Sequence, residues 1–395
     1  MRARGAVAFA VALVAMLVVG LWLGGHPRAL PEPLRDVFVA EPTGLVAEAA
    51  EAIEGNYYRP VGEKELGNAS LQGMVRELRK RHDDRFSEYF SPESLESFNQ
   101  QIEGRFSGIG LSVVEVKKGL RVAQVFPRSP ADRAGIEAGD TVVSVEGESI
   151  AGVSSGEATK KIKGPEGSEV TIGVRDGRSG KVRELTLTRA EVTLPNVSSR
   201  VEMVDGRKLG YVRLLSFSEG AHVLLGAAVE KVEKKGAEGI LLDLRHNPGG
   251  LLEEAVRSAS LFLPEGEVVV STASRSEGES VHETGDGRVT SLPLVVLIDR
   301  GSASAAEILA AALADHGATV VGSRSFGKGV FQEEQPLANG GALKLTVGEY
   351  FTPDGVNLAE SRGIHPDVKV RDKAETKADE VEERGFEVLA AKVGS

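Results

Sequence analysis

In the N-terminal part of the chain, the apolar and polar positions follow a helical pattern. Between residues 44 and 103 apolar side chains recur three and four positions apart, as at Leu71 and Val75, which is the spacing of an amphipathic helix. A further helix is expected to begin at Ser91, because Pro92 would occupy its first helical position. This part carries no residue cluster suited to catalysis, so it is predicted to be an adaptor, lid or dimerisation segment.

From residue 105 to 189 the pattern changes to short stretches that alternate apolar and polar residues and are separated by Gly-rich turns. Such alternation predicts half-buried strands. Two intervening segments, 129–136 and 154–164, are helix candidates. This part is therefore predicted to be a small β-rich domain with two short helices.

From about residue 191 the pattern becomes that of an α/β domain. A strand–turn–helix unit occurs twice, at 239–263 and 293–316, and its strands are almost wholly apolar, as expected for strands buried on both faces. Such units place ligands at the carboxyl ends of their strands. We expect three later segments to complete the same sheet and a polar C-terminal helix to follow; the segments are 326–335, 341–351 and 363–370.

The N-terminus has the composition of an export signal. An uninterrupted apolar run, Ala6 to Gly25, follows Arg2 and Arg4, and about 20 helical residues span one hydrocarbon core. No clean cleavage site follows, so the run favours an uncleaved signal-anchor over a cleaved signal peptide. The arginines would stay inside. The chain is then expected on the extracytoplasmic side, periplasmic or cell-surface, anchored in the cytoplasmic membrane by residues of about 6–25.

Charge and composition exclude several classes of protein. The net charge of −11 and the aromatic content of 5% argue against a nucleic-acid partner, which needs a basic face and stacking platforms. The absence of cysteine excludes disulfides, thiolate nucleophiles and Cys-ligated zinc.

Two turns that follow apolar strands offer groups for acyl transfer. In GSASAAEI, residues 301–308, a serine stands at a helix N-terminus, where free amides stabilise negative charge. Taken alone, the stretch favours a helix cap by Ser302 or Ser304. In LDLRHNPGGLL, residues 242–252, glycine amides could donate to an oxyanion, although an ordinary strand-to-helix turn explains the pattern equally well.

A third stretch, GSRSFGKGV at residues 322–330, resembles a phosphate-binding P-loop. Gly329 stands where a P-loop needs Ser or Thr, and no helix is predicted beyond. Two interpretations remain: an exposed lysine in a flexible loop, or Lys328 as a general base whose pKa is lowered by an apolar pocket. A neutral lysine and a serine would form a Ser–Lys dyad.

A Ser–His–Asp triad is the competing arrangement. His246 precedes the NPGG turn and could approach Ser304, whereas His316 directly follows Asp315, so that their side chains diverge on a helix. The triad is weaker than the dyad as an explanation of the pattern.

Together, DLRHNPGGLL, GSASAAEI and GSRSFGKGVFQ, in this order after a β-rich domain, resemble the carboxy-terminal processing peptidases, or tail-specific proteases. The resemblance runs from about residue 50 to 370. It implies a crotonase-like αβ catalytic core with an inserted PDZ domain, no metal and no cofactor. The expected parts are a signal segment with linker, a helical segment, the PDZ domain, the protease core and a C-terminal helix, at 1–33, 34–103, 104–190, 191–372 and 373–395.

The resemblance also implies roles for single residues. Ser304 would be the nucleophile, Lys328 the general base and Gln332 the residue that orients the lysine. Ser302 aligns with a capping residue and Asp315 with a structural acid. His246 stands where asparagine is common, and Arg300 occupies a variable position. The implied oxyanion donors are the amides of Gly249 or Gly250 and of Ala305.

The β-rich domain gains a role from the same resemblance. The segment Gly108, Ile109, Gly110 and Leu111 looks like a PDZ carboxylate-binding loop, in which successive amides hold a terminal carboxylate and the peptide adds as a strand. The expected partners are protein or peptide substrates with apolar C-termini, the membrane, and, as a conjecture, a second copy of the chain. The alternatives are a non-catalytic PDZ scaffold and, by fold analogy, acyl-thioester chemistry.

Overall fold

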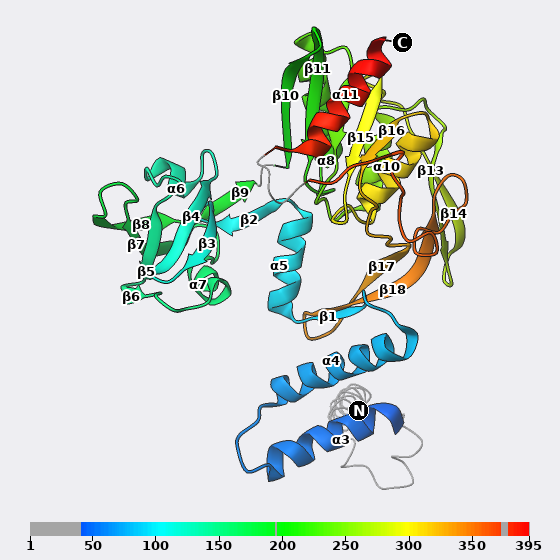
Figure 1. Ribbon diagram of the computed structural model, residues 1–395. Coiled ribbons are helices and arrows are strands. Elements are labelled where there is room, and N and C mark those ends of the chain that lie inside the picture. Colours follow the sequence, from blue (N-terminus) through cyan, green and yellow to red (C-terminus); the bar gives the residue numbers. More distant parts are fainter. Residues whose placement is uncertain (1–40, 194–195, 373–377, 395) are drawn as a thin grey trace, which may run out of the picture. The chain divides into compact units, whose positions relative to one another are not determined.

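The computed structural model describes residues 41–193, 196–372 and 378–394 (Figure 1). It divides into two compact units, one up to Tyr89 and one from Phe90 onward. The apolar run predicted as a membrane anchor, Ala6 to Gly25, lies outside the described residues. Within the described ranges, no helix has the length and apolar character needed to cross a membrane.

The helices predicted in the N-terminal part are confirmed. The first unit contains α3 (Glu41–Asn56) and α4 (Glu63–His82). In α4 the first turn is acidic and the last turn basic, an order that complements the helix dipole. Helix α5 (Pro92–Ile102) belongs to the second unit and begins as predicted, because the Ser91 Oγ accepts the Ser94 amide at 3.3 Å.

The β-rich domain has the predicted strands and helices. Its sheet has the order β3-β4-β5-β7-β8, and β2 pairs with β9 where the chain enters and leaves the domain. Its two helices are the predicted ones, and it has its own apolar core, which includes Leu120, Val142 and Ile172. The elements are β2 (Arg105–Gly108), β3 (Leu111–Val116), β4 (Gly119–Val125), α6 (Pro130–Arg133), β5 (Thr141–Val145), β6 (Glu148–Ser149), α7 (Ser155–Ile162), β7 (Glu169–Arg175), β8 (Val182–Thr188) and β9 (Ala190–Thr193).

A six-stranded sheet forms the centre of the α/β domain. Its order is β10-β11-β12-β15-β16-β19, with β10 antiparallel to β11 and all other neighbours parallel. The parallel strands therefore end at one common edge, where loops can bring functional groups together. The strands are β10 (Val197–Val204), β11 (Arg207–Leu214), β12 (Ile240–Asp243), β15 (Leu294–Ile298), β16 (Thr319–Gly322) and β19 (Val368–Lys369).

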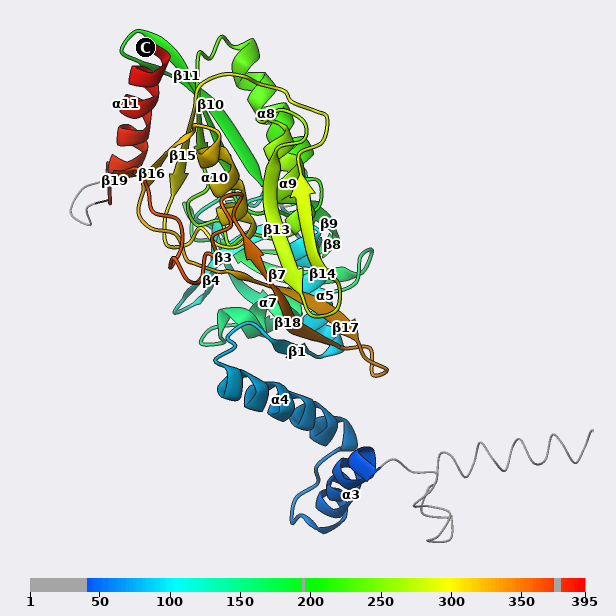
Figure 2. The ribbon, with the colours of Figure 1, turned by 90° about the vertical axis from the view of Figure 1, so that its right-hand side faces the viewer.

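Helices cover both faces of this sheet, as the apolar strands predicted. On β15, Val296 and Ile298 pack with α8 (Ala221–Lys234), α9 (Leu252–Ser260) and α10 (Ala305–Asp315), whereas Val295 and Leu297 pack with α11 (Glu380–Gly394) on the other face. Figure 2 shows α11 on the side of the sheet opposite α8 and α10. Because successive side chains point to opposite faces, a strand covered on both sides must be apolar throughout.

The prediction that three late segments complete the central sheet is wrong for two of them. Strands β17 (Val330–Pro336) and β18 (Ala342–Phe351) pair with each other, and β18 pairs with β13 (Val268–Ser274), which pairs with β14 (Gly278–Glu283). They form a separate antiparallel sheet (Figure 2). The short link between β17 and β18 suits an antiparallel hairpin, whereas a parallel neighbour would need a long crossover. Only β19 joins the central sheet.

Candidate active site

Ser304 lies at the carboxyl edge of the central sheet, between β15 and α10. It is the N-cap residue of α10 and has φ +57° and ψ −120°, a conformation that non-glycine residues rarely adopt. Gly249 lies against it, because a Cβ on Gly249 would come within 2.8 Å of the Ser304 Cβ. Ser304 is half-buried at this strained turn.

Ser302, the other serine of the motif, is a structural residue. Its side chain is fully buried, and its Oγ donates to the Leu244 carbonyl at 2.7 Å and accepts the Asp299 amide at 2.9 Å. These bonds fasten the loop after β15 to the end of β12. Ser302 therefore does not cap α10, and its hydroxyl is not available for attack.

A single buried carboxylate joins the loop after β15 to the loop after β16. Glu307 has no exposed surface, and it accepts hydrogen bonds from the amides of Ser304, Gly327 and Lys328 and from the Ser325 hydroxyl. The Ser304 and Lys328 amides bind the same oxygen, at 2.9 and 3.0 Å, so the two nitrogens lie within about 6 Å of each other. This contact brings the predicted nucleophile and the predicted base together.

The Lys328 ammonium is in an environment that favours its neutral form. Burial and, to a smaller extent, the positive charge of Lys344 lower its pKa to about 8, and Glu307 opposes this shift. Its Nζ donates to Gln332 Oε1 at 2.7 Å. The environment therefore supplies a lysine that can exchange protons near neutral pH.

Gln332 is positioned by an irregularity in the hairpin. The β17–β18 register shifts between Phe331 and Gln332, and such a bulge re-aims side chains. The Gln332 Nε2 donates to Thr346 Oγ1 on β18 at 3.3 Å. Its amide is thereby oriented with the oxygen toward Lys328, and the role of Gln332 in orienting a catalytic lysine stays a prediction.

The three amides predicted as oxyanion donors differ in availability. The Gly249 amide already donates to Asn247 Oδ1 at 2.9 Å. In the described part of the chain, the amides of Gly250 and Ala305 make no hydrogen bond. The two free amides therefore remain as candidates, and the prediction for Gly249 needs correction, because its donor is in use.

The two histidines of the alternative triad are engaged elsewhere. The His246 Nδ1 lies 2.9 Å from Asp299 Oδ2, with the side chain 75% exposed, and the His316 Nε2 lies 2.9 Å from Glu267 Oε2. Neither contacts Ser304 among the described residues. Burial raises the pKa of Asp315, as does neighbouring Asp354, and Asp315 ends α10 while Ser304 begins it, so it has no direct part in the site.

Sequence analysis missed several residues of the site. Glu307 carried a signal, because S-x-x-E from Ser304 is the spacing of a capping box. Lys344 and Tyr350 carried none, since they reach the site only through the pairing of β18. Tyr350 is 2% exposed beside Ser304, and its hydroxyl makes no well-aligned hydrogen bond with a described residue.

The predicted tail-binding segment lines a separate pocket of about 300 Å³. Gly108, Ile109, Gly110 and Leu111 contribute to it, together with α7, and the amides of Ile109 and Gly110 donate to no described residue. Gly110 has φ +84°, and a Cβ there would meet Ser129 at 2.1 Å, so only glycine fits. Two adjacent free amides in this geometry form an anion-binding nest.

Comparison with known proteins agrees with this architecture. Residues 208–370 match peptidase family S41, and residues 97–175 match the PDZ domain. The chain is 34% identical to the carboxy-terminal processing protease CtpA of Bacillus subtilis, over 82% of this chain and 67% of that protein. It is 33% identical to a probable CtpA-like serine protease of Staphylococcus haemolyticus, over 82% and 63%. The chain thus spans about two thirds of the length of these relatives.

A solved structure shows the same fold. The photosystem II D1 C-terminal processing protease aligns with a TM-score of 0.51 and 28% identity, over 88% of this chain and 97% of that one. The predicted α/β core with an inserted PDZ domain is confirmed. The chain therefore belongs to the carboxy-terminal processing proteases of peptidase family S41.

Proposed function

We propose that this protein is a serine endopeptidase with a Ser304–Lys328 dyad, which recognises protein C-terminal tails through its PDZ domain. The observation that carries the proposal is the lowered pKa of Lys328, about 8, on a loop that shares the Glu307 carboxylate with Ser304. A half-buried lysine on a loop that shares a carboxylate with a serine at a strained turn suits general-base catalysis.

The proposed reaction begins with proton transfer. Neutral Lys328 accepts the Ser304 Oγ proton while the oxygen attacks the scissile carbonyl carbon, and the amides of Gly250 and Ala305 stabilise the oxyanion. As the C–N bond breaks, the Lys328 ammonium donates its proton to the leaving amine. A water then attacks the acyl-enzyme, Lys328 accepts its proton, and Ser304 recovers a proton as the new C-terminus leaves.

The supply of neutral base sets the pH range of this mechanism. With a pKa of about 8, roughly a tenth of Lys328 is neutral at pH 7, compared with about one part in 2,500 for an ordinary lysine. Gln332 would orient the Nζ through its 2.7 Å hydrogen bond. Activity is expected to rise with pH up to about 8 and to level off above it.

The PDZ pocket supports recognition of a peptide C-terminus. The free amides of Ile109 and Gly110 can hold a carboxylate, and Leu111 and Ile162 supply apolar lining for a terminal side chain. A peptide that adds as a strand would place alternate side chains in such a pocket. We therefore propose substrates with a free, apolar C-terminus.

The proposed site of action is extracytoplasmic. The support is the apolar run Ala6 to Gly25 behind Arg2 and Arg4, which is typical of a signal-anchor. Exported or membrane-associated proteins would then be the substrates. Comparing the C-termini of cell proteins by mass spectrometry, with and without active Ser304, would identify them.

The test of the dyad uses an unstructured polypeptide with an apolar free C-terminus. Ser304→Ala and Lys328→Ala should each lower kcat by about 10³-fold or more. Ser276→Ala, at an exposed serine in the β13–β14 hairpin, is the matched control and should keep wild-type turnover. Full turnover by Lys328→Ala would rule out the dyad.

The same assay separates the alternative functions. Tail-peptide binding by the wild-type chain without turnover at any pH would favour a scaffold. Saturable binding of coenzyme A, measured by titration, would favour acyl-thioester chemistry. Cleavage that depends on both Ser304 and Lys328 excludes both alternatives.

A further inference from the structure

A second pocket of the catalytic core is basic. It encloses about 500 Å³ and is lined by five side chains that carry or can carry positive charge: Arg300, Arg324, His365, Lys369 and Arg371. It opens at the carboxyl ends of β15, β16 and β19, and Figure 2 shows β16 and β19 side by side. Among the described residues that line it, none is acidic.

The positive charges of this basic pocket are not neutralised within the described parts of the chain, where the three arginines and Lys369 form no ion pair. The acids nearest in sequence are engaged elsewhere. Asp299 pairs with His246, Asp367 accepts a backbone amide of β16, and Asp372 lies 3.8 Å from Arg245. Four permanent cations around one cavity contrast with the net charge of −11, so the pocket is locally attractive to anions on a chain that otherwise repels them.

The basic pocket lies close to the catalytic loops. Arg300 precedes Ser304 by four residues, and Arg324 precedes Lys328 by four. Four residues reach at most about 14 Å, so the backbone at the pocket lies within that distance of the dyad. An extended peptide advances about 3.3 Å per residue. A chain held at Ser304 would therefore reach the pocket within about four residues of the scissile bond.

We propose that the basic pocket binds acidic side chains of the polypeptide substrate, within about four residues of the bond that is cut. This inference rests on the proposed function. Arginine guanidinium groups bind carboxylates in a bidentate manner, and three arginines line this cavity. The ligand is a polypeptide because a polypeptide is what the adjacent dyad would hold. Cleavage sites flanked by Glu or Asp would then be preferred.

Binding tests the pocket without relying on turnover. The full chain with Ser304→Ala is titrated with two fluorescent peptides that are identical except that one contains two Glu residues where the other contains two Gln residues. Both peptides end in a C-terminal amide, which removes the carboxylate recognised by the PDZ pocket. The Glu peptide should bind about five-fold more tightly at low salt. Adding Arg300→Gln and Arg324→Gln should abolish the difference, as should 1 M NaCl. Adding Arg257→Gln, an exposed arginine on α9, should not.

Cleavage of the same peptides separates the two proposals. In the active chain, kcat/KM should favour the Glu peptide by about five-fold, and the double arginine variant should lose this preference. Equal binding of both peptides by the unsubstituted pocket would overturn the pocket proposal even if both are cut. Preferential binding, with no cleavage of either sequence even when its C-terminus is a free carboxylate, would overturn the dyad and support the pocket. If the arginine substitutions weaken binding to phosphatidylglycerol vesicles and leave the peptides unaffected, the pocket proposal is also wrong.

Discussion

At the scale of single residues, the proposed chemistry depends on opposing charges around one lysine. Burial and Lys344 lower the pKa of Lys328, whereas Glu307 raises it. The negative charge of Glu307 is offset by four hydrogen-bond donors, which spread this charge over two backbone loops. The carboxylate can therefore fix the geometry of both loops while Lys328 remains easy to deprotonate.

Replacing Lys344 tests this balance. Lys344→Gln removes a like charge, so the pKa of Lys328 should rise and the acid limb of the kcat/KM profile should move to higher pH. Because catalysis needs neutral Lys328, activity at pH 7 should fall about two- to five-fold, and activity well above pH 9 should be unchanged. Steady-state kinetics from pH 6 to 10 would measure both. The control Lys181→Gln, exposed in the β-rich domain, should leave the profile in place; a shift to lower pH for Lys344→Gln would contradict the assignment.

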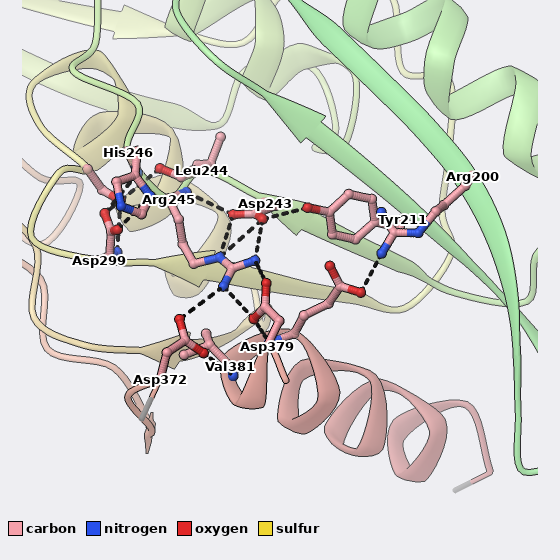
Figure 3. Close-up of polar contacts among 12 residues, drawn as sticks. Arg200, Tyr211, Asp243, Leu244, Arg245, His246, Asp299, Asp372, Asp379 and Val381 are labelled. Carbon is pink, nitrogen blue, oxygen red and sulfur yellow. Dashed lines mark hydrogen bonds and ion pairs between the residues drawn. The ribbon is translucent and has the colours of Figure 1, made fainter. Parts of the chain in front are cut away.

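At the scale of elements, the C-terminal helix is tied to the strand that leads into the NPGG turn. Arg245 is buried, and its guanidinium binds both Asp243 and Asp379, the latter at 2.7 and 2.9 Å (Figure 3). Asp379 also accepts the Glu382 amide at the start of α11. The turn that contains Gly249 and Gly250 follows shortly after Arg245. Helix α11 therefore supports the turn that faces Ser304.

This network predicts a pH-dependent stability. Burial alone would raise the pKa of Asp379, but the hydrogen bonds from Arg245 and a backbone amide outweigh burial and lower it. The stabilisation is therefore complete above the unfolded pKa near 4 and is lost as the pH falls below it. Asp379→Asn should lower the free energy of unfolding of the catalytic core by about 1–2 kcal/mol at pH 7. Denaturant titration would measure this change.

The control for this network is Asp372→Asn. Asp372 is half exposed and 3.8 Å from Arg245, so its loss should cost less than about 0.5 kcal/mol. The gap between wild type and Asp379→Asn should narrow as the pH falls below about 4 and close only below the lowered folded-state pKa of Asp379. An equal loss at pH 7 and pH 3 would show that Asp379 does not act through its charge.

The elements that could be predicted from the sequence are those whose burial gives them a clear pattern of apolar residues. The helix α10 and the strands β12 and β15 were visible because both faces of the sheet are covered. Strands β10 and β14 were missed, since VSSRVEMV and GESVHE have little apolar alternation and their side chains are largely accessible. Their pairing depends on neighbours distant in the chain, which periodicity does not encode.

At the scale of the whole molecule, the candidate site residues that stand in short sequence motifs could be predicted. The residues that reach the site only through the packing of distant strands could not. Ser304, Lys328 and Gln332 stand in short stretches with recognisable spacing. Lys344 influences Lys328 only because β18 crosses beside β17, and the basic pocket requires β19 next to β16. The loss of the Gly249 amide to Asn247 likewise followed from turn geometry. Sequence thus indicated the proposed reacting groups, and the fold supplied the charges that surround them.

The last prediction concerns the two distinct pockets of the second unit. If the PDZ pocket holds a terminal carboxylate on the amides of Ile109 and Gly110, a peptide substrate should lose binding when its C-terminus is amidated, because charge-assisted hydrogen bonds are among the stronger ones. KM should rise about ten-fold or more in the full chain. The Glu-over-Gln preference assigned to the basic pocket should persist in the amidated peptide, since Arg300 and Arg324 lie in the catalytic core. An amide that leaves KM unchanged would show that tail recognition uses other contacts, while loss of the Glu preference on amidation would show that one surface serves both functions.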